Sequence, residues 1–238
     1  MARTLPDSND VFVWALDDGP GTHVNTGTFG SVGNWADYGN PISNTQGIVG
    51  RALYVPGSFV SPNHDGAGGA NDVIVTPTLT LSGWVFVRRS PNFFAELFNK
   101  QYFLNGWSSP FLTFGIQMDN TSDGQWHFYI TLNGTLQSVS SGSNNVIAPG
   151  RWYHIGGTWD GATLIAYMNG SVVASSAFSG TIDYGTAGNR GQWYAGAIPG
   201  SATVQGAPAL IQDIRVANIA RPQSYFANIY YNGVHING

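Results

Sequence analysis

The chain has 238 residues, no cysteine and a net charge of −4, and only 9% of its residues are Asp, Glu, Lys or Arg. Without cysteine, disulfide bonds and thiolate metal sites are excluded. No basic patch supports nucleic-acid binding, and no apolar run reaches the ~18 residues that a membrane-spanning helix needs. We therefore expect neither a nucleic-acid partner nor membrane insertion.

Alternation of apolar and polar residues recurs along the chain and predicts an all-β protein. The expected strands are 11–16, 51–55, 79–87, 95–100, 111–118, 125–132, 151–159, 163–168, 171–178, 192–197 and 209–216. Residues 22–50 are predicted to form a long loop with short strands, and residues 56–70 and 137–149 are predicted to form loops. Residues 224–231 are predicted to form a short helix, with Ser224 as its N-cap and Pro222 just before it.

The strongest local signal lies in residues 150–170, GRWYHIGGTWDGATLIAYMNG. Asp160-Gly161 separates two strand-like runs, and Asn169-Gly170 follows the second run. Asn133-Gly134 follows the strand before them in the same way. Because Asn, Asp and Gly tolerate the positive φ of tight turns, these dipeptides predict β-hairpins.

This hairpin resembles the central hairpin of the laminin-G-like, concanavalin A-like jelly rolls. The matching residues are Trp152, His154, Ile155, Thr158, Trp159, Asp160, Gly161, Leu164, Tyr167, Met168, Asn169 and Gly170. The resemblance extends over about residues 11–230, and it implies an antiparallel jelly-roll β-sandwich with one short C-terminal helix. Since the chain has no internal repeat or linker, we expect an N-terminal arm (1–10) and a single jelly-roll domain (11–238).

The residues argue against an enzyme. Glu96 is the only glutamate, whereas the glucanases of this fold carry a strand motif with two glutamates and an aspartate. No cysteine and no G-x-S-x-G pattern offers a nucleophile. We therefore expect no catalytic residues.

Aromatic residues in segments rich in Gly, Asn and Ser are candidates for stacking against sugars. They are Trp35, Tyr38, Trp107, Trp193 and Tyr194. The alternative for each of them is packing in the core.

We expect no cofactor, and calcium is the one candidate metal. The resemblance implies a calcium site in the loop near Asp72, where Asp65, Asn71 and Asp72 supply oxygen ligands. The alternative is that these residues bond to the backbone of turns.

Two functions remain open. The first is a non-enzymatic structural or adhesion protein on a virion surface, such as a phage capsid decoration, tail or fibre component that forms homo-oligomers, docks on neighbouring subunits and contacts glycans. The low charge and an N-terminus without the apolar run of a signal peptide favour it. The second is an extracellular, lectin-like carbohydrate-binding domain, with calcium as its candidate metal.

Overall fold

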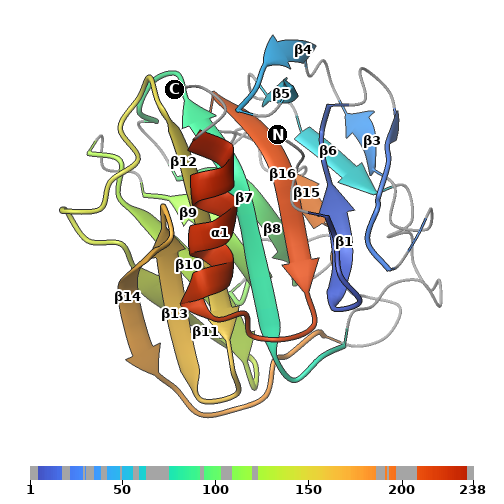
Figure 1. Cartoon of the computed structure of the whole chain (residues 1–238). Coiled ribbons are helices and arrows are strands. Elements are labelled where there is room, and N and C mark those ends of the chain that lie inside the picture. The colour runs from blue at the N-terminus through green and yellow to red at the C-terminus, as the bar shows by residue number, and fades with distance from the viewer. Residues whose placement is uncertain are drawn as a thin grey trace.

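The computed structural model describes residues 5–17, 22–28, 30, 35–38, 42–48, 50–55, 59–62, 75–91, 94–102, 109–119, 123–185, 191, 193–196 and 208–234. These residues form two antiparallel sheets that pack face to face, with one helix on the outside (Figure 1). The predicted all-β sandwich with one short C-terminal helix is therefore confirmed.

Sheet A has eight strands in the described part of the chain, in the order β14-β13-β12-β7-β16-β5-β4, and β1 also pairs with β16. The strands are β1 (Asp10–Trp14), β4 (Ile42–Gln46), β5 (Arg51–Val55), β7 (Leu79–Val87), β12 (Trp152–Trp159), β13 (Thr163–Met168), β14 (Ser171–Ala177) and β16 (Ala209–Ala217). One edge of β16 thus binds β5 along its first residues and β1 along its last.

Sheet B also has eight strands among the described residues, in the order β11-β10-β9-β8-β15-β6-β3-β2. They are β2 (Thr22–His23), β3 (Trp35–Tyr38), β6 (Phe59–Pro62), β8 (Ala95–Gln101), β9 (Leu112–Met118), β10 (Trp126–Leu132), β11 (Thr135–Ser140) and β15 (Trp193–Ala195). β11 and β14 are the end strands of the two sheets, and they lie on the same side of the sandwich.

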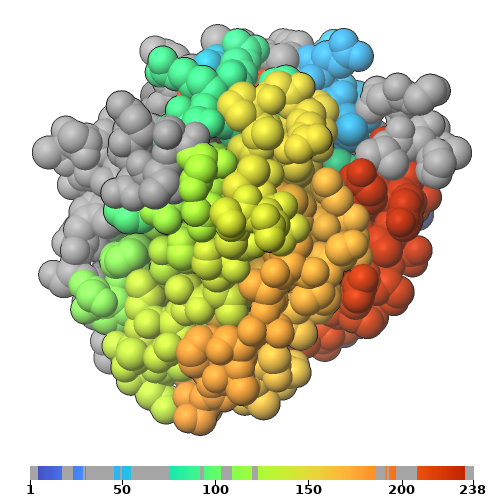
Figure 2. Space-filling view, turned by 90° about the vertical axis from the view of Figure 1, so that its left-hand side faces the viewer, coloured from blue at the N-terminus to red at the C-terminus, as the bar shows by residue number. Residues whose placement is uncertain are grey.

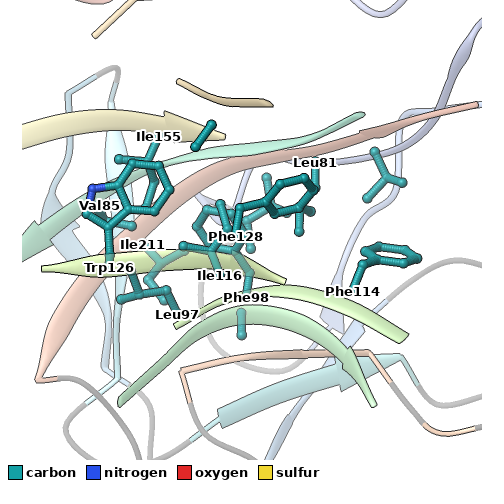
Figure 3. Close-up of a cluster of buried hydrophobic side chains, with 14 of the residues drawn as sticks. Leu81, Val85, Leu97, Phe98, Phe114, Ile116, Trp126, Phe128, Ile155 and Ile211 are labelled. Carbon is teal, nitrogen blue, oxygen red and sulfur yellow. The ribbon is translucent and has the colours of Figure 1, made fainter. Parts of the chain in front are cut away.

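The core lies between the sheets and takes alternate side chains from both (Figure 3). Sheet A contributes Leu81, Val85, Ile155 and Ile211, while sheet B contributes Leu97, Phe98, Phe114, Ile116, Trp126 and Phe128. All of these side chains are at most 1% exposed. Each such burial contributes about 1.5–3 kcal/mol, so the core fixes which face of each strand looks outward.

The predicted hairpin turns are confirmed. Asn133 and Asn169 adopt φ values of 47° and 52°, and Gly161 adopts φ 102°. The side chain of Asn169 also accepts a hydrogen bond of 3.0 Å from the backbone N–H of His154. The turn between β13 and β14 is thereby tied to β12, the strand on the other side of β13.

Helix α1 (Gln223–Val234) covers the outer face of sheet A (Figure 1). Phe226 stacks on Tyr167 of β13 at 3.9 Å between ring centroids. A Cβ on Gly156 of β12 would lie 2.7 Å from the Phe226 ring and 2.7 Å from the carbonyl oxygen of Leu81. Only glycine therefore allows the helix to approach the sheet this closely.

The segment before β1 is held by an ionic contact with the residues that precede α1. Arg221 donates hydrogen bonds to Asp7 at 2.6 and 2.7 Å and to Asp10 at 2.8 Å. The hydrogen bonds from Arg221 lower the pKa of Asp7 to about 2. Residues 7–10 of the predicted N-terminal arm thus contact the chain's own sandwich.

Two strands lie in segments that were predicted to be loops. β6 falls within residues 56–70, and most of β11 falls within residues 137–149. Both segments lack a strong apolar alternation, so strand pairing decides their structure. β6 pairs with β3 and β15, and β11 pairs with β10 across the Asn133-Gly134 turn. Among the described residues, no helix has the length and apolar character that crossing a membrane requires.

His154 is 1% exposed and lies between the rings of Trp84 and Phe226, with centroid distances of 5.2 and 6.1 Å. Burial, and then the positive charge of Arg215, lowers the pKa of His154 to about 3. In the unfolded chain its pKa returns to about 6.5, so below pH 6.5 the unfolded state binds a proton that the folded state refuses. Stability should therefore fall as the pH drops from 6.5 toward 3.

We expect His154 to remove on the order of 3 kcal/mol of stability between pH 7 and pH 4. Urea unfolding of the wild type and of His154→Leu at both pH values measures this. The variant should lose less stability on acidification than the wild type. Equal losses would mean that other groups, such as the carboxylate of Asp7, account for the acid sensitivity.

Candidate functional site

The outer face of sheet B, turned away from the core, carries two rows of side chains across neighbouring strands. Because directly paired residues of an antiparallel sheet point to the same side, the register defines both rows. The first row is Glu96, Gln117, His127 and Ser140. The second row is Tyr194, Asn99, Gly115, Tyr129 and Ser138.

Glu96 lies at the β8 end of the first row and is fully buried. Gln117 donates a hydrogen bond of 2.5 Å to one carboxyl oxygen, and Asn99 donates one of 3.2 Å to the other. Burial raises the pKa of Glu96 to about 8, although both amide donors oppose this rise. At neutral pH the carboxyl is therefore mostly protonated and uncharged.

Asn99 fits on this face because β9 has a glycine opposite it. A Cβ on Gly115 would lie 2.4 Å from the Cβ of Asn99. The Asn99 side-chain oxygen is buried and accepts no hydrogen bond from the protein.

An aromatic strip, defined as Phe111, Tyr129 and His127, crosses this face. The rings of His127 and Tyr129 stack at 5.4 Å with an interplanar angle of 25°, and Phe111 lies 6.3 Å from Tyr129. All three side chains are only partly buried. The strip therefore offers ring surface to a ligand.

Acidic groups flank the aromatic strip. The Nε2 atom of His127 lies 3.6 Å from the carboxylate of Asp119, and both side chains are about one-fifth exposed, at 21% and 22%. Burial, and then the negative charges of Glu96 and Asp119, raises the pKa of Tyr129 to about 12. Tyr129 thus keeps its hydroxyl proton and can donate a hydrogen bond.

Two of the predicted glycan-binding aromatics, Trp193 and Tyr194, are buried. Trp193 is 4% exposed and contacts Phe12 at 5.5 Å and Phe114 at 5.0 Å. Tyr194 is 2% exposed and packs with Leu112 underneath the aromatic strip. Neither ring offers a face to solvent, so they cannot serve as the exposed platforms that their surroundings in sequence suggested.

The other predicted site residues have no described side chains. Trp35 and Tyr38 begin and end β3, of which the structure describes the backbone. Trp107 and the predicted calcium ligands Asp65, Asn71 and Asp72 lie outside the described residues. Within the described ranges, no group of three His, Asp or Glu side chains is close enough to hold a metal ion.

The sequence did contain a signal for the aromatic strip. In the run WHFYI (126–130), every residue is aromatic or aliphatic, so both faces of the strand carry rings. Trp126 and Phe128 enter the core, and this leaves His127 and Tyr129 on the outside. An aromatic row on the face opposite the core is the feature that would have identified them.

Residues 63–225 match a laminin G family model whose description is the concanavalin A-like lectin/glucanases superfamily. The chain belongs to this superfamily. A search of curated proteins finds no match, whereas many solved structures share the fold.

Three of the similar structures show the range of proteins in which this fold occurs. One is the binding domain of paraclostridial mosquitocidal protein 1, with a TM-score of 0.69 and 14% identity over 96% of this chain and 53% of that chain. A second is the sialidase of Trypanosoma rangeli in complex with 2,3-difluorosialic acid. Its TM-score is 0.65 and its identity 14%, over 95% of this chain and 33% of that chain. The third is domain 4 of AbnA, an extracellular arabinanase from Geobacillus stearothermophilus, in complex with arabinotriose. Its TM-score is 0.60 and its identity 14%, over 93% of this chain and 98% of that chain.

Because the sequence identities to these structures are low, the similarities establish the fold alone. The chain spans about half of the mosquitocidal chain (53%) and a third of the sialidase (33%). Function must therefore be argued from the outer face of sheet B itself.

The protonated state of Glu96 predicts a dependence of stability on pH. Its folded pKa of about 8 lies above the ordinary value of 4.5, so the folded state holds a proton that the unfolded state releases between these values. Stability should fall as the pH rises from 4.5 to 8, by on the order of 3 kcal/mol by pH 7.

Glu96→Gln replaces the carboxyl with an amide of similar shape and should remove this loss. We expect the variant to gain stability over the wild type as the pH is raised from 5 to 8, in denaturant unfolding followed by tryptophan fluorescence. A constant difference between the two proteins across this pH range would show that Glu96 is ionised in the folded state.

Proposed function

We propose that this chain is a non-enzymatic carbohydrate-binding domain that holds its ligand on the outer face of sheet B. The observation that carries the proposal is the aromatic strip, with its two stacked and partly exposed rings of His127 and Tyr129. The apolar face of a sugar ring packs on such rings, while its hydroxyl groups bond to neighbouring polar side chains. Ser138, opposite Tyr129, and Asp119, next to His127, are polar neighbours of this kind.

The similar structures support binding as the role of the fold. The arabinanase domain is a structure in complex with arabinotriose, and this chain covers 98% of that domain. The mosquitocidal structure is named as a binding domain. One of these structures is thus named for binding, and the other contains a bound sugar.

The carboxyl groups favour binding over hydrolysis. Glycoside hydrolysis normally needs two carboxyl groups on opposite sides of the scissile bond. Glu96, the only glutamate, is fully buried, and both of its oxygens accept hydrogen bonds from amide groups. A carboxyl held in this way supports the sheet and does not reach a substrate.

The binding proposal is tested by removing the central ring of the strip. A glycan array should first identify ligands of the wild type. For the best of them, Tyr129→Ala should weaken binding at least about tenfold, as loss of a central aromatic contact does. Isothermal titration calorimetry gives the two dissociation constants.

Tyr231→Ala is the matched control, because Tyr231 is 57% exposed on helix α1, on the other sheet. This variant should bind like the wild type. Unchanged binding by a folded Tyr129→Ala protein would contradict the site, and a glycan array without any ligand would contradict the function.

A structural subunit on a virion surface is the alternative proposal, in place of an extracellular domain. It is favoured by long segments of described surface strands without any charged residue, such as residues 161–182. Such surfaces suit permanent contacts with neighbouring subunits. This alternative predicts a closed homo-oligomer of three or more chains in solution without a ligand, and light scattering checks its mass.

A further inference from the structure

One side of the sandwich carries almost no charge. Residues 124–150 and 161–182 contain no Asp, Glu, Lys or Arg. They build β10, β11, β13 and β14, and the end strands β11 and β14 meet on this neutral side. Figure 2 shows it, with β10 and β11 in yellow-green beside β13 and β14 in orange, and with α1 in red at the right.

The strand β11 presents a regular and unprotected edge on the neutral side. Its six residues, TLQSVS, pair with β10 without any shift in register. Natural proteins usually protect such an edge with lysine, proline, a bulge or a covering segment. β11 has neither a charged residue nor a proline, and no described backbone group bonds to its outer edge. β14, by contrast, has a register shift against β13.

We propose that β11 pairs antiparallel with β11 of a second copy of this chain. Leu136, Ser138 and Ser140 point to the outer face, because they lie opposite Thr131, Tyr129 and His127. A two-fold axis normal to the sheet keeps outer residues opposite outer residues whenever a residue lies on the axis. Gln137 and Ser138 are the two central residues of the strand. With Ser138 on the axis, all three outer residues pair within the strand: Ser138 faces Ser138 of the second copy, and Leu136 faces Ser140.

The absence of charge favours a second copy over another partner. In a two-fold interface every residue near the axis meets its own counterpart, so any charge there would repel itself. The neutral side avoids this repulsion, while the net charge of −4 opposes other encounters between two copies. Gln137 and Val139 face each other in this register, and they are also uncharged.

The pairing would join the outer faces of two B sheets into one continuous surface. β10 of one copy would then lie three strand spacings from β10 of the other, which is about 14 Å. This consequence rests on the proposed function, since it places two aromatic strips on one face for a single glycan chain. The pairing itself does not depend on a ligand.

Light scattering across micromolar to millimolar concentrations should show a mass that rises from one chain to two. A single-chain mass at every concentration would overturn the proposal. The interface is small, with six residues in each strand, so a concentration-dependent dimer is expected.

Cysteine substitution tests the register, because the chain contains no cysteine of its own. Residues directly opposite in an antiparallel pair have Cα atoms ~4.5–5.5 Å apart, within the range that a disulfide spans. Ser138→Cys should therefore form a two-chain band on a non-reducing gel under mild oxidation. Ser175→Cys, exposed on β14, is the matched control and should remain a single chain. Faster linkage of the β14 variant than of the β11 variant would overturn the assignment to β11.

A charge at the two-fold position gives a second readout. Ser138→Lys brings two ammonium groups together in the dimer, and it should raise the dimer dissociation constant at least about tenfold. Asn228→Lys adds the same charge on the exposed side of α1 and should leave dimerisation unchanged. A folded Ser138→Lys protein that dimerises like the wild type would also overturn the proposal. None of these measurements uses a glycan, so their failure is separate from a failure of the binding function.

Discussion

The burial of alternate side chains from both sheets in one core is the constraint on which the rest of this structure depends. Since the strand repeat is two residues, each side chain that enters the core sends its neighbours to the opposite face. On β10, Trp126 and Phe128 occupy the core, and this directs His127 and Tyr129 outward. A slip of one residue would exchange the two pairs and destroy both the core and the aromatic strip. The candidate site is thus fixed by the same register that stabilises the sandwich.

The two outer faces of the sandwich differ because helix α1 lies on only one of them. On sheet A, the helix buries Trp84 and His154 under Phe226 and Tyr230, and Gly156 permits its close approach. On sheet B, the corresponding face keeps partly exposed rings at β9 and β10. Sheet A also keeps two partly exposed rings, those of Phe86 and Trp152, 5.7 Å apart. On sheet B the partly exposed rings stand beside the polar side chains of Asp119 and Ser138. The neutral edge strand β11 borders this same face, so the proposed dimer would enlarge it.

Much of the fold could be predicted from local patterns. The Asp160-Gly161 and Asn169-Gly170 turns, the alternating strands around them and the final helix all depend on neighbours in the sequence. The site could not be predicted in the same way. Trp193 stands in a glycine-rich segment, but its burial comes from Phe12 and Phe114, which are distant in the sequence. The run WHFYI is a local signal for the rings of His127 and Tyr129, but the row forms through the pairing of Tyr129 with Gly115, and of Gly115 with Asn99, on other strands.

Several of the charged residues that the structure buries are neutralised, whereas buried Lys100 donates a hydrogen bond to the Gly191 carbonyl oxygen. Asp213 binds Arg215 at 3.0 Å, Asp10 binds Arg221 at 2.8 Å, and Glu96 retains a proton because burial raises its pKa to about 8. An uncharged carboxyl bonds like an amide, so Glu96, Gln117 and Asn99 together hold β8 against β9 beneath the aromatic strip. With little net charge to steer a partner over a distance, recognition by this protein must depend on contact itself. Ring stacking on sheet B and backbone pairing at β11 are the two kinds of contact that we propose.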